Sequence, residues 1–252
     1  DDGIANGIIR ERQGIVGRLV PDSTYEELIA SLEINLNALL AKGITSITDA
    51  SKRPGEFVMF EEIYSNPSMP LPRSAWQFQW FDPEGIAEVK ERVGDGDEFL
   101  KIGPIKVFVD GGFTGPAAYT LEPYLNQGDY RGYLNMPEKE LVTMLNEIHD
   151  AGWQMGIHAI GDAAIELVVD TLADTLNRSP REDHRHYLNH FSMRPPERTM
   201  ELMSEHSIHI TQQPNFTYTL EGRYVANLDG WRLEHNNPIR SPMDHGITVA
   251  IS

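Results

Sequence analysis

The sequence predicts an α/β protein, an incomplete (β/α)8 TIM-like barrel. Short apolar strands alternate with amphipathic helices over 252 residues, a pattern typical of βαβ units and a parallel sheet. Polar residues stand at the ends of the predicted strands, one per unit, where barrels gather their active sites. A doubly wound open sheet fits the same strand count, but no Gly-rich dinucleotide fingerprint follows the first strand. The barrel is therefore favoured.

Seven strands and five helices are expected in order. The first helix begins with a possible capping box of Ser23 and Glu26, carries leucines on one face, and stops at Gly43. The stretch between 213 and 248 has no clear periodicity, and an eighth strand would have to precede residue 1. The expected helices are 23–42, 83–93, 137–152, 163–176 and 196–206, and the expected strands are 44–48, 74–81, 102–109, 154–160, 186–191, 208–213 and 248–251.

Composition limits the classes of function. The length suits one barrel domain spanning 1–252, and the net charge of −17 disfavours binding to nucleic acid or anionic membranes. No apolar run is long enough to cross a bilayer, and the chain has no cysteine, which excludes thiolate metal sites and cysteine nucleophiles. We expect a cytoplasmic protein acting on a small molecule, and a homo-oligomer stays open.

The strand at 105–110 carries a lysine in an unusual place. If Ile105 and Val107 pack on the helices, alternation points Lys106 and Asp110 into the barrel. A lysine there is costly unless it is paired, neutralised or chemically altered. An ion pair of Lys106 with Asp110 or Asp49 explains the residue equally well.

Two histidines follow on the next two strands. Alternation places His158 inward near the end of one strand, and His190 ends the next. Neutral imidazoles at similar height on adjacent strands can share a Zn²⁺ ion. Asp162 is expected to cap the next helix, whereas His184 and His186 begin a strand and are interpreted as structural.

At these residues the sequence resembles the amidohydrolase superfamily, in particular its YtcJ-like branch (amidohydrolase family 3), which includes N-substituted formamide deformylases. The resemblance covers nearly the whole chain as an ordered set of motifs, none specific alone. The motifs are GIIRE at 7–11, GITSITDA at 43–50, IKVFVDG at 105–111, GYLNMP at 132–137, AGWQ at 151–154 and IHAIGD at 157–162.

This resemblance implies a metal-binding barrel beside a small β-sandwich. It implies that Lys106 is a carboxylated bridging lysine and that His158 and His190 are metal ligands. One or two divalent cations, with Zn²⁺ expected, would activate water to attack the carbonyl of a small non-peptide amide.

The sequence also departs from the family pattern. The His-x-His pair of the first barrel strand is absent, the sequence ends at Ser252 where the catalytic Asp of a Ser-Asp dipeptide is due, and Asn189 replaces a Glu. We therefore expect a barrel cut at both ends that, taken alone, binds metal weakly and is inactive.

Two other functions remain open. One is a barrel remnant without catalysis that binds or regulates, and the other is a metal-free lyase or isomerase using Lys106 as a Schiff-base amine. Aromatic and polar residues past the strand ends are expected to line a substrate pocket, although ordinary loop packing accounts for them equally well. These residues are Trp80, Phe113, Tyr119, Gln213 and Phe216.

Overall fold

The computed structural model describes residues 7, 14–52, 54–80, 92 and 94–252. The expected helix 83–93 lies almost entirely outside the described residues, as does most of the motif at 7–11. Over the part of the chain that is described, no helix is both long and apolar enough to span a membrane.

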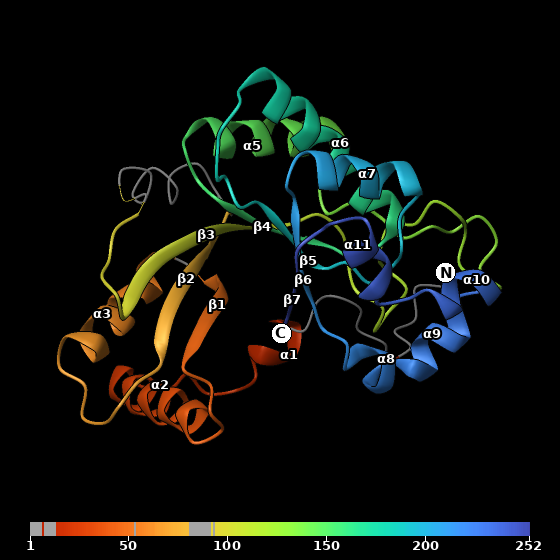
Figure 1. The fold of residues 1–252 in the computed structure, drawn as a ribbon. Coiled ribbons are helices and arrows are strands. Elements are labelled where there is room, and N and C mark those ends of the chain that lie inside the picture. Colours follow the sequence, from red (N-terminus) through yellow and green to blue (C-terminus); the bar gives the residue numbers. More distant parts are fainter. Residues whose placement is uncertain (1–6, 8–13, 53, 81–91, 93) are drawn as a thin grey trace.

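One seven-stranded sheet forms the centre of the molecule, with its strands parallel and in sequential order (Figure 1). The sheet curls into part of a cylinder, so the chain is an incomplete (β/α)8 barrel, as predicted, with β1 and β7 at the two edges. The strands are β1 (Ser46–Lys52), β2 (Arg73–Gln79), β3 (Leu100–Phe108), β4 (Met155–Ala159), β5 (Tyr187–His190), β6 (His209–Gln212) and β7 (Val249–Ile251).

The register of the central strands decides which side chains share a level. Phe108 of β3 lies opposite His158 of β4, and His158 in turn lies opposite Asn189 of β5. His190 pairs with Ala159, one residue further along. The two histidines predicted as ligands therefore stand within one residue of the same height.

Helices cover the outer face of the sheet, and Figure 1 shows α5, α6 and α7 side by side over its central strands. Thr24 and Glu27 form the capping box of the first long helix, one residue later than Ser23 and Glu26, because the helix itself begins at Tyr25. The helix at 57–65 was not predicted; its few turns carry only three buried apolar side chains. The outer helices are α2 (Tyr25–Leu40), α3 (Phe57–Ser65), α5 (Glu138–Asp150), α6 (Asp162–Arg178) and α7 (Glu197–Glu205).

The main core lies between the sheet and these helices. Ile105 and Val107 of β3 and Ile157 of β4 belong to it and are almost fully buried, which confirms the predicted outward direction of these side chains. Burying each such side chain contributes about 1.5–3 kcal/mol. Because their neighbours alternate, Lys106 and His158 must face the barrel interior.

A cap covers the carboxyl ends of the central strands. It is formed by residues 110–136 and by 213–248, a stretch without predicted structure that in fact contains four short helices. These helices are α8 (Phe216–Thr219), α9 (Glu221–Asn227), α10 (Gly230–Glu234) and α11 (Arg240–Asp244). A second apolar cluster, including Phe113, Tyr124 and Tyr224, joins the two segments. The buried Arg232 donates to the carbonyl oxygens of Glu122 and Pro123, which fastens α10 to the other segment.

Candidate metal and substrate site

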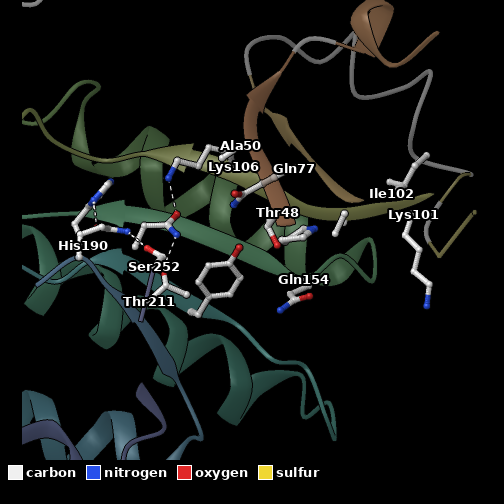
Figure 2. A pocket seen from close by; sticks show the side chains of 16 residues that line it. Thr48, Ala50, Gln77, Lys101, Ile102, Lys106, Gln154, His190, Thr211 and Ser252 are labelled. Atoms are coloured by element: carbon white, nitrogen blue, oxygen red, sulfur yellow. Dashed lines mark hydrogen bonds between the residues drawn. The ribbon is translucent and has the colours of Figure 1, made fainter. Parts of the chain in front are cut away.

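A cavity of about 600 Å³ runs along the inside of the curled sheet. Figure 2 shows Lys106, His190 and Ser252 at one end and Gln154 and Lys101 at the other. A second cavity of about 700 Å³ adjoins the carboxyl ends of β2 and β3 and is lined by His158, Trp80 and Asp110 among others.

Lys106 projects into the first cavity from near the carboxyl end of β3, as predicted. Its side chain is buried, with 4% of its surface exposed, and this burial lowers its pKa to about 7. Nζ donates to the side-chain oxygen of Asn189 at 2.5 Å and lies 5.0 Å from the centre of the Phe108 ring. The partner of the lysine is therefore a neutral amide, which leaves the amine free to lose its proton near neutral pH.

Asp110 is not the ion-pair partner of Lys106 that the sequence offered as an alternative. Its carboxylate accepts backbone hydrogen bonds from Tyr119, Ile160 and Gly161 at 2.8–3.1 Å. These bonds hold the loop after β3 against the loop after β4. Asp110 also lines the second cavity.

Asp162 likewise has a structural role, although not as the helix cap that was expected. Gly161 is the N-cap of α6, and Asp162 is the first residue of the helix. The Asp162 carboxylate accepts from the backbone N–H groups of Leu121 and Ala163, and burial raises its pKa.

His158 lines the second cavity, and one nitrogen of its ring has no hydrogen-bond partner. Its Nε2 is buried without a hydrogen bond, and the closest recorded carboxylate oxygen, on Asp110, is 3.4 Å away. The ring stands edge-on to that of His190, with centroids 4.6 Å apart. Buried polar atoms without a hydrogen-bond partner are rare in native structures, so this nitrogen is a candidate for binding a ligand.

His190 ends β5 in a strained backbone conformation. Its φ is 75° and that of Phe191 is 49°, both in the left-handed region that non-glycine residues seldom adopt. Each such residue costs on the order of 1–3 kcal/mol and persists only where its surroundings hold it. Burial lowers the pKa of the His190 ring to about 3, with His158 and Lys106 adding to the effect, so the ring is neutral and able to bind a cation.

These donors fit part of a cation site. His190 offers a neutral imidazole, and the adjacent His158 offers an Nε2 without a hydrogen-bond partner. Lys106 ends beside the Phe108 ring, whose centroid lies 5.2 Å from that of the His158 ring. Within the described residues, no three His, Asp or Glu side chains come close enough to hold a metal ion by themselves. A carboxylated Lys106 would add the oxygen ligand that this set lacks.

The predicted pocket residues fall into two groups. Trp80 lines the second cavity, Gln213 lines the first, and Phe216 stacks on His190 with ring centroids 6.1 Å apart. Phe113 is 2% exposed in the apolar cluster of the cap and lines neither of these cavities. Tyr119 packs against the main core, so loop packing accounts for both of these residues.

Sequence reasoning missed several polar residues of the barrel strands. Gln77 is buried and donates to the carbonyl oxygen of Gly156, where a side chain would collide with it. Thr211 accepts from the Asn189 amide at 2.8 Å, and Gln212 donates to the carbonyl oxygen of Phe191. Alternation along β2 and β6 was the available signal for Gln77 and Thr211, which line the first cavity. Gln212 follows Thr211 and therefore points to the opposite face of the sheet.

A family model described as the amidohydrolase family matches residues 1–252. The chain belongs to the amidohydrolase family. Among curated proteins it is 27% identical over 88 residues to YtcJ of Bacillus subtilis, named provisionally as an amidohydrolase, covering 35% of this chain and 16% of YtcJ. It is 25% identical over 162 residues to LONG AFTER FAR-RED 3 of Arabidopsis thaliana, covering 60% of this chain and 28% of that protein.

Solved structures share the fold of this amidohydrolase chain. A metal-dependent hydrolase from Pyrococcus furiosus superposes with a TM-score of 0.79 at 20% identity, over 97% of this chain and 50% of its own. A second, from Pyrococcus horikoshii, gives 0.77 at 19% identity over 96% and 47%. The chain therefore spans about half the length of these two structures.

Proposed function

We propose that this chain forms the metal-binding part of a hydrolase that cleaves C–N bonds in small, non-peptide amides. The observation that carries the proposal is the pair of imidazoles with centroids 4.6 Å apart, one with a buried, unpartnered Nε2. Membership of the amidohydrolase family supports the hydrolase class. The similarity to the two Pyrococcus proteins, which are described as metal-dependent hydrolases, supports a divalent cation, and Zn²⁺ suits imidazole ligands.

His158, His190 and Lys106 would hold the cation. When bound, a zinc ion supplies Lewis acidity and lowers the pKa of water toward about 7. The two histidines would donate nitrogen lone pairs to the cation, and their burial would keep bulk water away from the reacting carbonyl. Phe216 and Trp80 provide apolar surface beside the rings for an organic amide.

Lys106 would act as a carbamate. With a pKa of about 7, roughly half of the amine is neutral at neutral pH. The neutral nitrogen attacks CO2, a new N–C bond forms, and one proton leaves to solvent. The carbamate nitrogen keeps one hydrogen, which can still donate to Asn189. A carboxylate in place of this amide would stabilise the ammonium form and oppose the reaction.

Zinc content tests the proposal. The chain is produced with bicarbonate and Zn²⁺ and measured by plasma mass spectrometry beside a His158→Ala/His190→Ala double variant. We expect zinc in the wild type and its loss in the double variant. A His206→Ala/His235→Ala variant is the matched control, because both side chains lie outside the cavities described above.

The outcomes separate the candidate functions. Zinc retained by the double variant, or absent from both proteins, would overturn this site. In the second case the lowered pKa of Lys106 favours the Schiff-base alternative, which borohydride trapping of a carbonyl compound at Lys106 would reveal. A binding role would be favoured only if a longer form of the protein, with the His-x-His pair and the Ser-Asp dipeptide, bound zinc and turned over no amide, because the chain alone is expected to be inactive.

A further inference from the structure

Gln212, the last residue of β6, and Gln213, which follows it, hold the strained carboxyl end of β5 in place. Gln212 is fully buried, and its Nε2 donates to the carbonyl oxygen of Phe191 at 3.1 Å. Phe191 N donates to the carbonyl oxygen of Ala159 at 3.2 Å. The side-chain oxygen of Gln212 accepts from the backbone N–H of Gln213 at 2.6 Å. The backbone of Phe191, which directly follows His190, and that of Gln213 are thus tied to each other through the Gln212 side chain.

The Gln213 side chain meets the His190 ring directly. Its Oε1 lies 2.7 Å from His190 Nδ1, while its Nε2 donates to the hydroxyl of Ser252. An amide has a donor at one end and an acceptor at the other. In the structure the Nε2 end of this amide faces Ser252 and the Oε1 end faces the ring, an arrangement that matches a hydrogen on His190 Nδ1. The lone pair is then on Nε2.

We propose that Gln213 is a positioning residue for His190: it fixes the neutral Nδ1–H tautomer and the plane of the ring, and so presents Nε2 as the ligating atom. Phe216 stacks on the ring at an interplanar angle of 18°, and His158 meets its edge, which limits other rotations. The predicted effect on metal binding rests on the proposed function, whereas the predicted tautomer of His190 does not depend on it.

The tautomer is measured first, in metal-free protein. Long-range ¹H–¹⁵N spectra of protein labelled at histidine distinguish Nδ1–H from Nε2–H, and a His190→Ala variant assigns the signals. We expect Nδ1–H for His190 in the wild type. Gln213→Met should lose this preference because it removes the acceptor at similar length, and Gln213→Glu should keep it. Gln127→Met, which removes an amide contact to Asn227 in the cap, should leave the His190 signals unchanged.

Zinc affinity is measured next on the same proteins by competition with a fluorescent chelator. Loss of a group that orients a metal-bound histidine weakens binding about 10- to 100-fold. We expect that loss in Gln213→Met and less than a threefold change in Gln213→Glu and Gln127→Met.

Two results would overturn the inference. One is an Nε2–H signal for His190 in the wild type, which would mean that the Gln213 amide faces the other way. The other is an unchanged tautomer in a folded Gln213→Met variant. If Gln213→Met does not fold, an altered tautomer in Gln213→Glu overturns the inference and an unaltered one supports it. If the tautomer follows Gln213 but no variant binds zinc, the positioning role stands and the proposed function fails.

Discussion

Histidines at the two ends of this sheet are both buried and yet have different surroundings. At the amino end of the strands, His149, His184 and His186 form a closed network. His149 Nε2 donates to Ser179 O at 2.9 Å, so its Nδ1 must accept from His186 Nε2 at 3.0 Å. His186 Nδ1 then accepts from Met155 N at 3.1 Å.

His184 completes this amino-end network. Its Nε2 donates to His206 O at 2.9 Å, and its Nδ1 accepts from His186 N at 3.0 Å. Every ring nitrogen of the three histidines therefore has a protein partner and one defined protonation state. At the carboxyl end, by contrast, His158 Nε2 has no hydrogen-bond partner and the tautomer of His190 leaves its Nε2 as an acceptor. Partner satisfaction, rather than burial, distinguishes a structural histidine from a candidate ligand.

The largest expected effect compares one histidine from each end. His186→Leu leaves the buried Met155 N–H and His149 Nδ1 without their partner, so we expect the free energy of unfolding to fall by about 3 kcal/mol. His158→Leu removes a buried nitrogen that makes no hydrogen bond and only a 3.4 Å contact with Asp110, and we expect a change within about 1 kcal/mol. Urea unfolding followed by circular dichroism measures both. An equal decrease in the free energy of unfolding of both variants would show that the two histidines do not differ in their structural role.

The pH dependence of stability is the next effect, because both ends contribute to it. Burial lowers the pKa of His186 to about 2 and that of His190 to about 3, whereas an unfolded histidine titrates near pH 6.5. Below about pH 6.5 these histidines are protonated in the unfolded chain but not in the folded chain. The free energy of unfolding therefore has its full value above this pH and decreases as the pH falls further. Each group contributes about 1.4 kcal/mol per pH unit once it titrates.

A variant isolates one of these contributions. His190→Leu should reduce the slope of stability against pH between 6 and 4 by about one proton, as measured by urea unfolding at several pH values. Arg181, Arg178 and Asp150 face the amino-end network and are present in both proteins, so they cancel in the difference. An unchanged slope would mean that His190 is protonated in the folded chain and is not a candidate ligand.

Lys106→Met should change stability in the direction opposite to His186→Leu. At pH 7 the unfolded chain carries a full proton on this lysine and the folded chain about half of one, so burial of the amine destabilises the fold. Lowering this pKa from 10.5 to about 7 costs about 4 kcal/mol at pH 7. The lost bond to Asn189 offsets part of what the variant regains, so the variant should be about 3 kcal/mol more stable at this pH. This advantage should shrink toward pH 10, and thermal unfolding across that range checks it. A destabilised variant would instead assign Lys106 a structural role.

Much of this architecture follows from the sequence by itself. The alternation of apolar residues in 105–109 and 155–159 determined which side chains enter the barrel, and this places Lys106 and His158 inside without any structural information. Side-chain direction in a strand has a period of two, so one buried face specifies the other. Motif order along the chain pointed to the family that the whole-chain match then established.

The hydrogen-bond partners of those side chains could be seen only in the folded structure. The bond of Lys106 to Asn189 joins residues 83 positions apart, and that of His190 to Gln213 joins residues 23 apart. Neither local periodicity nor residue type distinguishes Asn189 from Asp110 as the partner of the lysine. That choice depends on the register of neighbouring strands and on the backbone N–H groups that already occupy the carboxylate. Both arise only when distant segments pack, because hydrogen bonds act over about 3 Å in space and not along the chain.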